Sequence, residues 1–348
     1  MSPRRIAEAT VRRKSAPHAV SRPKILLLSL GGTINASATR ASRRYVSGRG
    51  RLSSLLNSVP ELKRLADLRV IGGGRSGSQG ITDAAWIKLA RRVETARVAG
   101  TARGIVIAHG TDTLEETAWF LDLVTTRGAP VVLVGACRPP KALSPDGPRN
   151  LRDAVLVAAS PASRDRGVLV VMDETIYAAA DVAKSHTTAV GAFRATRAGP
   201  LGHIEVDGTI HFGRPPDAGN PAARFPIPSG LSLPRVDITY MYAGVTADVV
   251  EHAMNVGARG LIVAGVGNGN MPSGVLAAVR KAVRRGICVV RCSRIGSGFV
   301  ARNVEVSDDL VGTVAGGWHS PVRARVLLQL WLAAGGRKRT ELQELMVC

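Results

Sequence analysis

ILLL at residues 25–28 and GIVIA at residues 104–108 decide the fold of this chain. Each is an apolar run of strand length, typical of a strand buried on both faces of a parallel sheet. Each is followed at once by a threonine-bearing turn, GGTI at 31–34 and HGTDT at 109–113. A single such turn has a plain alternative, a threonine that caps a helix. Two of them favour a site beyond the carboxyl ends of the strands, where open parallel sheets bind ligands.

Strands and helices alternate through the first half of the chain. Strands are expected near residues 24–30, 68–72, 104–109, 131–135 and 167–173, and helices near 83–98, 113–126 and 148–159. This alternation predicts an α/β fold with a parallel sheet covered by helices on both faces. At the third helix, Asp146 and Pro148 suit the capping and first-turn positions.

Residues 213–233 are rich in proline and are predicted to be a linker. Beyond them the alternation resumes, with strands expected at 236–242, 260–265 and 287–291 and helices at 246–257, 273–285, 321–334 and 339–347. The sequence therefore predicts a larger N-terminal parallel-sheet domain with flanking helices over residues 23–212, and a smaller C-terminal α/β domain over residues 234–348.

The charge is strongly positive and uneven. The 348 residues include 47 Lys and Arg against 26 Asp and Glu, a net charge of +21. Residues 1–50 hold eleven of the basic residues and one acid, Glu8. The basic run shows neither an RNA-binding motif nor interleaved aromatic residues. We predict a disordered basic tail over residues 1–22 that is dispensable for activity, and no specific nucleic-acid partner.

Cysteine usage indicates a reducing compartment. The four cysteines show no zinc spacing, and Cys288 and Cys292 fall on one expected strand, where a disulfide is hard to form. With no apolar segment before Lys24 to suggest a signal peptide, the expected location is cytoplasmic. No apolar run is long enough for a membrane span, so no membrane partner is expected.

Metal and nucleotide sites are not expected. The histidines show no H-x-x-x-H spacing. A G-x-G-x-x-G match at 72–77 lacks an acid at the dinucleotide spacing, and no Walker lysine follows a glycine cluster. We predict neither a metal nor a cofactor.

Seven further blocks follow the first threonine turn in a fixed order. They are Tyr45, GSQ at 77–79, VGACRP at 134–139, SPDGPRN at 144–150, DVAK at 181–184, GVGNGN at 265–270 and VEV at 304–306. Together with the two turns, this series resembles the bacterial-type L-asparaginases and glutaminase-asparaginases from about Lys24 to the C-terminus, with a block at 265–270 similar to the type II branch. The chain departs from the family at Leu30 and Cys137, where threonine and methionine are usual.

The resemblance implies two catalytic groups. Thr33 matches the nucleophile and Tyr45 the tyrosine that accepts its proton, which requires nearby positive charge to lower the tyrosine pKa. Thr111, Asp112 and Lys184 match the second group, in which a lysine held by a carboxylate acts as a base. Asp112 also suits the α-amino group of an amino-acid substrate. From the residues alone, Tyr45 reads as a loop tyrosine and Lys184 as a solvated lysine.

The resemblance also implies the substrate contacts. Ser78 and Gln79 match residues that hold the α-carboxylate, and Ala136 matches a position whose backbone carbonyl faces the side-chain amide. Asn270 and Glu305 match residues that a neighbouring subunit supplies. A homo-oligomer is therefore implied, a tetramer built as a dimer of dimers. Backbone N–H groups near the two threonine turns are expected to stabilise the oxyanion.

The implied function is that of an L-asparaginase, which hydrolyses L-asparagine to L-aspartate and ammonia by threonine nucleophilic catalysis. Whether L-glutamine is a second substrate stays open, because the two amides differ by one methylene. One alternative is the amidase-like subunit of a tRNA-dependent amidotransferase, which suits the basic charge but carries an additional N-terminal barrel, for which the 23 residues before Lys24 are too few. The other alternative is an inactive homologue, against which the full set of catalytic residue types argues.

Overall fold

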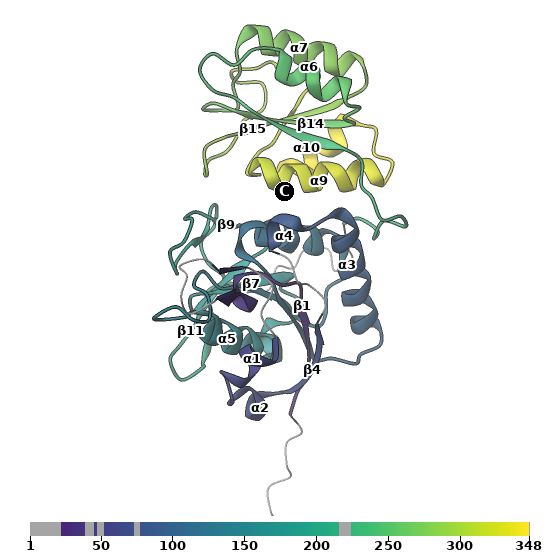
Figure 1. The fold of residues 1–348 in the computed structure, drawn as a ribbon. Helices are drawn as coiled ribbons and strands as arrows, with labels where there is room; N and C mark the ends of the chain where they lie inside the picture. Colours follow the sequence, from purple (N-terminus) through teal and green to yellow (C-terminus); the bar gives the residue numbers. More distant parts are fainter. Residues whose placement is uncertain (1–21, 39–44, 47–51, 73–76, 216–223, 348) are drawn as a thin grey trace, which may run out of the picture.

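The computed structural model describes residues 22–38, 45–46, 52–72, 77–215 and 224–347, which form two stacked α/β domains (Figure 1). The N-terminal domain contains the larger sheet and the C-terminal domain the smaller one, so the predicted fold class is confirmed. Of the predicted tail of residues 1–22, residues 1–21 lie outside the described residues. Within the described chain, no helix is both long enough and apolar enough to cross a membrane.

The large sheet has the strand order β12-β11-β8-β7-β6-β5-β1-β4. Its parallel strands are β1 (Lys24–Ser29), β4 (Asp67–Gly72), β5 (Gly104–Ala108), β6 (Val131–Val134) and β7 (Val168–Met172). An antiparallel extension follows, made of β8 (Thr175–Ala178), β11 (Gly202–Ile204) and β12 (Ile210–Phe212). The sequence analysis missed this extension, because strands of three or four residues are too short to show a period.

The order of the strands places a switch point between β1 and β5. From β1 the chain moves outward to β4, and it then crosses back to form β5 on the other side of β1. At such a reversal the connections at the carboxyl ends of neighbouring strands leave in opposite directions and open a crevice for ligands. The turns with Thr33 and Thr111 follow these two strands.

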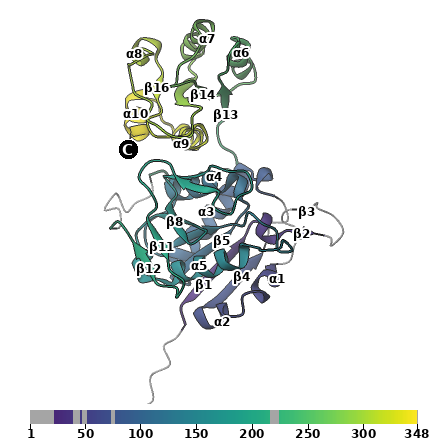
Figure 2. The same ribbon diagram turned by 90° about the vertical axis from the view of Figure 1, so that its left-hand side faces the viewer.

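Helices cover both faces of the large sheet (Figure 2). On one face lie α3 (Asp83–Val98) and α4 (Leu114–Val124), and on the other α1 (Leu52–Asn57), α2 (Leu62–Leu65) and α5 (Gly147–Ala159). Along β5, Ile105 and Ile107 pack in the first core and Val106 and Ala108 in the second, all fully buried. Burial on both faces explains why the strand sequence is apolar without alternation.

Two short antiparallel hairpins lie outside the large sheet. They are β2 (Ser37–Ala38) with β3 (Tyr45–Val46), and β9 (Val182–Lys184) with β10 (Phe193–Ala195). Both hairpins carry residues that the sequence analysis assigns to the site.

The C-terminal domain is a smaller three-layer unit. Its parallel sheet contains β13 (Val236–Tyr240), β14 (Gly260–Gly265), β15 (Cys288–Ser293) and β16 (Val314–Ala315). One face is covered by α6 (Asp248–Asn255), α7 (Ser273–Arg284) and α8 (Asp308–Val311), and the other by α9 (Pro321–Ala333) and α10 (Arg339–Val347). In Figure 1, α9 faces α4 of the N-terminal domain.

The α4–α9 contact joins the domains through a continuous apolar core and buried polar bonds. Trp119 donates its indole N–H to the Arg323 carbonyl at 3.2 Å. The buried Arg323 guanidinium donates to the Ala180 carbonyl at 2.6 Å and to Thr196 Oγ1 at 2.9 Å. These acceptors lie on either side of β9 and β10, so the C-terminal domain braces the segment that carries Lys184.

Glu116 makes this interface sensitive to pH. It lies 3.9 Å from Arg325, and burial raises the pKa of Glu116 from 4.5 to about 7. At pH values between the unfolded-state pKa of 4.5 and the folded-state pKa of about 7, the folded protein binds more protons than the unfolded protein. The Glu116 carboxyl therefore lowers the stability of the fold as the pH rises through this range. We expect Glu116→Gln to become more stable relative to the parent protein by up to roughly 3 kcal/mol between pH 4.5 and 8.

Urea unfolding at a series of pH values measures this effect. The matched control is Glu344→Gln, which makes the same chemical change at an exposed position of α10. If Glu116→Gln and Glu344→Gln gave the same dependence of unfolding free energy on pH, buried Glu116 would not be the source.

Candidate active site

Thr33 begins the short 3-10 turn η1 (Thr33–Asn35), which follows β1, and its side chain is nearly buried. Gly31 and Gly32 have φ values of 99° and 91°, a region that residues with a Cβ rarely adopt. A Cβ on Gly32 would also lie only 2.3 Å from the Gly110 Cα. Glycine is therefore required at position 32, where it lets the turn after β1 touch the turn after β5.

Two other turns pack against these. A Cβ on Gly110 would lie 2.7 Å from Ser78 Oγ, which belongs to η2 (Ser78–Gly80), the short turn that follows β4 in sequence. A Cβ on Gly135, which follows β6, would lie 2.9 Å from Thr111 Cγ2. The segments that follow β1, β4, β5 and β6 therefore meet at one edge of the sheet, with Thr33, Ser78 and Thr111 among them.

Lys184 joins Thr111 and Asp112 in a hydrogen-bonded group. Its Nζ lies 2.9 Å from Thr111 Oγ1 and 2.6 Å from Asp112 Oδ1. Thr111 belongs to η3 (Thr111–Thr113), directly before α4, whereas Lys184 ends β9. The Lys184 side chain is 15% exposed and that of Asp112 is 63% exposed. The Lys184 amino group is thus largely sheltered from solvent, whereas the Asp112 carboxylate remains accessible to an incoming molecule.

Glu115 holds Lys184 in place, and the sequence analysis missed it. One carboxylate oxygen of Glu115 accepts the backbone N–H of Lys184 at 2.7 Å, which fastens β9 to the start of α4. Burial raises the pKa of Glu115, and the Lys184 N–H opposes that rise. The sequence contains one indication of this role, because Glu115 stands four residues after Thr111 and residues four apart lie on the same side of a helical segment.

The third turn is held by Asp146 and Asn150. The Asp146 carboxylate accepts the backbone N–H groups of Cys137 and Arg138, each at 2.9 Å, and Asn150 donates to the Gly135 carbonyl at 3.1 Å. Ala136 lies between these anchors and is buried. Asp146 does occupy the N-cap position of α5, but its side chain makes no capping bond there. The predicted cap is therefore corrected to a clamp on the turn.

Ser78 and Gln79 differ in accessibility. The Ser78 side chain is buried, and its Oγ makes no hydrogen bond to any other described residue. Its carbonyl accepts the Thr113 hydroxyl at 2.9 Å, which ties η2 to η3. Gln79 is exposed at the same turn. A buried hydroxyl without a partner is costly, so Ser78 Oγ is available to a polar ligand group.

Tyr45 is located by its backbone alone. It lies in β3, paired with Ala38 of β2, and β2 follows η1 by one residue. The strand with Tyr45 therefore runs beside the chain that leaves Thr33. The Tyr45 side chain lies outside what the structure describes.

Asn270 and Glu305 form a pair in the C-terminal domain. Asn270 donates from Nδ2 to Glu305 Oε2 at 2.7 Å, and its Oδ1 accepts the Met271 N–H at 2.9 Å. Among the described residues, no hydrogen bond connects this pair with Thr33, Ser78, Thr111 or Lys184 of the same chain. One chain therefore presents the predicted site residues as two separate groups.

His109 lies in a buried hydrogen-bond network next to the second threonine turn. It is fully buried, with Nδ1 2.7 Å from the Gly110 carbonyl and Nε2 2.9 Å from Thr117 Oγ1. Burial lowers the pKa of His109 to about 4, so the ring is neutral at pH 7. Trp86 donates to the same Thr117 hydroxyl at 2.8 Å and completes the network. Within the described residues, no group of three or more His, Cys, Asp and Glu is placed to hold a metal ion.

Comparisons with known proteins show the family to which the chain belongs. Residues 24–218 match the family model described as asparaginase, N-terminal, and residues 235–346 match that of the glutaminase/asparaginase C-terminal domain. The probable periplasmic L-asparaginase of Haemophilus influenzae is 40% identical, covering 91% of each chain. L-asparaginase 2 of Escherichia coli is 40% identical over 90% of each chain, and the glutaminase-asparaginase of Acinetobacter glutaminasificans 37% identical over 88% of this chain and 94% of its own.

The fold, the site and these matches together define an amidohydrolase. The chain belongs to the asparaginase family, over both of its domains. The predicted resemblance is thereby confirmed.

Proposed function

We propose that this enzyme hydrolyses L-asparagine to L-aspartate and ammonia. The observation that carries the proposal is the Thr111–Lys184–Asp112 group, packed through Gly32 and Gly110 against the turn of Thr33. Such an arrangement delivers two hydroxyls and a sheltered amine to one crevice. Both L-asparaginases and glutaminase-asparaginases are among the relatives, so L-glutamine is proposed as a second substrate.

In the proposed first step, Thr33 Oγ attacks the side-chain amide carbon. Its proton passes to Tyr45, the C–N bond breaks, and the leaving nitrogen takes up that proton to depart as ammonia. In the second step, water attacks the acyl-threonine and gives a proton to the Thr111–Lys184 pair, the bond between the acyl carbon and Thr33 Oγ breaks, and Thr33 Oγ takes up a proton to regenerate its hydroxyl. Backbone N–H groups of the glycine turns stabilise the negative charge that develops on the carbonyl oxygen.

The substrate is proposed to bind through its α-substituents. Ser78 Oγ, which lacks a partner among the described residues, is suited to donate to the α-carboxylate, with Gln79 beside it. The open side of the Asp112 carboxylate suits the α-ammonium group. The Ala136 carbonyl, in the turn that Asp146 clamps, suits the side-chain N–H₂. These contacts favour a free amino acid over a peptide, because both α-groups are used.

Steady-state ammonia release tests this function. Purified enzyme is assayed with L-asparagine, with L-glutamine and with N-acetyl-L-asparagine, which lacks the α-ammonium charge. We expect turnover of L-asparagine without tRNA and a loss of at least about 10²-fold with the acetylated amide, because the contact between the α-ammonium group and the Asp112 carboxylate is lost. Ammonia release that required charged tRNA would favour an amidotransferase subunit, and no release under either condition would favour an inactive homologue.

We further propose a homotetramer built as a dimer of dimers, in which Asn270 and Glu305 complete the site of a neighbouring subunit. The proposal is supported by the separation of the two groups within one chain. Mixing two inactive proteins, Thr33→Ala and Glu305→Ala, should restore about a quarter of the parent activity, because half of randomly formed dimers are hybrids and each hybrid has one intact site of two.

The mixing experiment uses subunits that are dissociated and then allowed to reassociate. Each variant treated alone in the same way is the control and should stay inactive. Hybrids without activity, or an active monomer in size-exclusion chromatography, would contradict the shared site.

A cytoplasmic location is proposed as well. Cys137, Cys288 and Cys292 are free thiols, and burial raises the pKa of Cys137 to about 11 and of each of the others to about 12, which keeps them protonated. One relative is named as periplasmic, so the location needs a direct test. Cell fractionation with antibody detection is that test, and recovery of the protein in the periplasmic fraction would overturn the proposal.

A further inference from the structure

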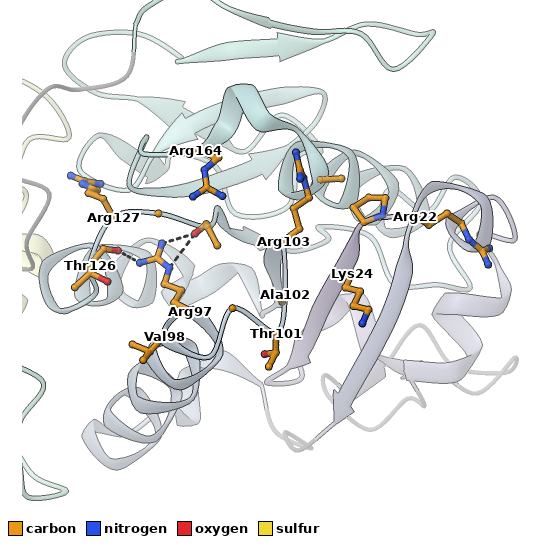
Figure 3. Close-up of a pocket in the computed structure, with 15 residues that line it drawn as sticks. Arg22, Lys24, Arg97, Val98, Thr101, Ala102, Arg103, Thr126, Arg127 and Arg164 are labelled. Carbon is orange, nitrogen blue, oxygen red and sulfur yellow. Dashed lines mark hydrogen bonds between the residues drawn. The ribbon is translucent and has the colours of Figure 1, made fainter. Parts of the chain in front are cut away.

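A basic pocket lies at the amino ends of the central strands, at the opposite end of the sheet from the threonine turns. It has a volume of about 880 Å³ and is bounded by residues 22–24 at the start of β1, 100–103 before β5 and 126–129 before β6, with the end of α3 as one wall (Figure 3). Its fifteen lining residues, all described, include six basic side chains and neither an acid nor an aromatic ring. The six are Arg22, Lys24, Arg97, Arg103, Arg127 and Arg164.

Two of these cations belong to the wall. Arg97 donates to the carbonyl groups of Thr126 and Ala129, which Figure 3 shows as dashed lines. Burial lowers the pKa of Arg97 to about 10, so it still carries its charge at pH 7. Arg127 is 3.1 Å from Asp122 and is neutralised in part. Glu94, Asp122 and Asp165 partly oppose the lowering of the Arg97 pKa, and none of these three acids lines the pocket.

Three cations remain available to a ligand. Lys24, Arg103 and Arg164 are exposed, and none of them forms an ion pair with an acid in the described part of the chain. In Figure 3, the Arg103 and Arg164 side chains point to one side of the strands, whereas that of Lys24, on the adjacent strand, points to the other. Arg22 is different, because its guanidinium donates to the Lys63 carbonyl. A concave surface with several unpaired cations has a strong positive potential.

We propose that this pocket binds a linear chain of phosphates, and specifically inorganic polyphosphate. Arginine forks and a lysine ammonium match successive phosphate oxygens along such a chain. A single-stranded nucleic acid would gain affinity from aromatic side chains that stack on its bases, which the described lining residues lack. The recessed shape fits a thin chain better than a flat anionic surface.

The pocket is separate from the amide site. Lys24 begins β1 and Thr33 follows it, so the length of the strand, roughly 20 Å, lies between them. The residues proposed to meet a neighbouring subunit belong to the other end of the sheet and to the C-terminal domain, which leaves this edge accessible.

The test compares two triple variants of the full-length enzyme. The pocket variant is Lys24→Gln/Arg103→Gln/Arg164→Gln. The matched control is Arg280→Gln/Lys281→Gln/Arg284→Gln, which removes one lysine and two arginines from the exposed, convex surface of α7. Binding of labelled polyphosphate of defined length is followed by fluorescence anisotropy at several salt concentrations, and ammonia release is measured on the same samples.

We expect the pocket variant to bind polyphosphate at least about tenfold more weakly at low salt, with a salt slope lower by about 2–3, whereas the control stays close to the parent. Ammonia release should be unchanged in both, so the outcome is independent of the proposed reaction. Equal weakening in the two variants would show that only net charge matters and would overturn the pocket. A competition experiment on the parent protein uses single-stranded RNA with the same number of phosphates as the polyphosphate. If this RNA displaced labelled polyphosphate at a lower concentration than unlabelled polyphosphate does, the proposal would be overturned in favour of nucleic acid.

Discussion

Replacing Thr33 by alanine is expected to lower L-asparagine turnover by at least about 10³-fold, because the acyl group then has no hydroxyl to receive it. The side chain is nearly buried at the junction of two turns, but the substitution removes only two heavy atoms, Oγ1 and Cγ2, and the glycine contacts at position 32 are kept. The variant should therefore fold. Steady-state ammonia release measures the loss, and circular dichroism with thermal unfolding checks the fold.

Thr111→Val is the companion change, and it is nearly isosteric. One methyl group of valine can occupy the position of Thr111 Cγ2, where it packs near Gly135, while Lys184 loses the hydroxyl at 2.9 Å and keeps Asp112. We expect a loss of at least about 10³-fold as well, because deacylation needs that hydroxyl to position water or relay its proton. A folded Thr33→Ala or Thr111→Val protein with turnover near that of the parent would end the two-threonine mechanism.

The second large effect is expected at Lys184. Lys184→Met keeps the length of the side chain but removes the amino group that bonds to Thr111 and Asp112, so we expect turnover to fall by about 10²–10⁴-fold, the range for loss of a catalytic base. The Lys184 backbone N–H, which Glu115 accepts, is unaffected. The β9 segment should thus stay in place, and the loss should appear in kcat more than in stability.

Lys141→Met is the control for this change. Lys141 is exposed in the segment between β6 and α5 and forms no ion pair within the described residues, so its replacement should change turnover less than about twofold. Comparable losses at Lys141 and Lys184 would mean that the effect comes from overall charge and not from the hydrogen-bonded group.

The sequence by itself determined the parts of this protein that depend on local patterns. The apolar runs of β1 and β5 predict strands buried on both faces, because each face of the sheet is covered by helices and every side chain must be apolar. The turns that follow them were recognisable because glycine and threonine stand within a few residues of the end of each apolar run. Fold class, family and most candidate residues follow from such signals, each contained in a few consecutive positions.

Only the tertiary structure decided which of these residues touch. Lys184 lies 73 positions from Thr111, and Gly32 meets Gly110 because the parallel register that pairs Ser29 with Ala108 sets the two turns side by side. The same holds for the hydrogen bond between the Glu115 carboxylate and β9, and for the three unpaired cations that line one pocket where strands distant in sequence begin. Contacts of this kind arise from the order and register of strands, which no single segment encodes, because each strand carries the same apolar signal and pairing is chosen by the packing of the whole sheet.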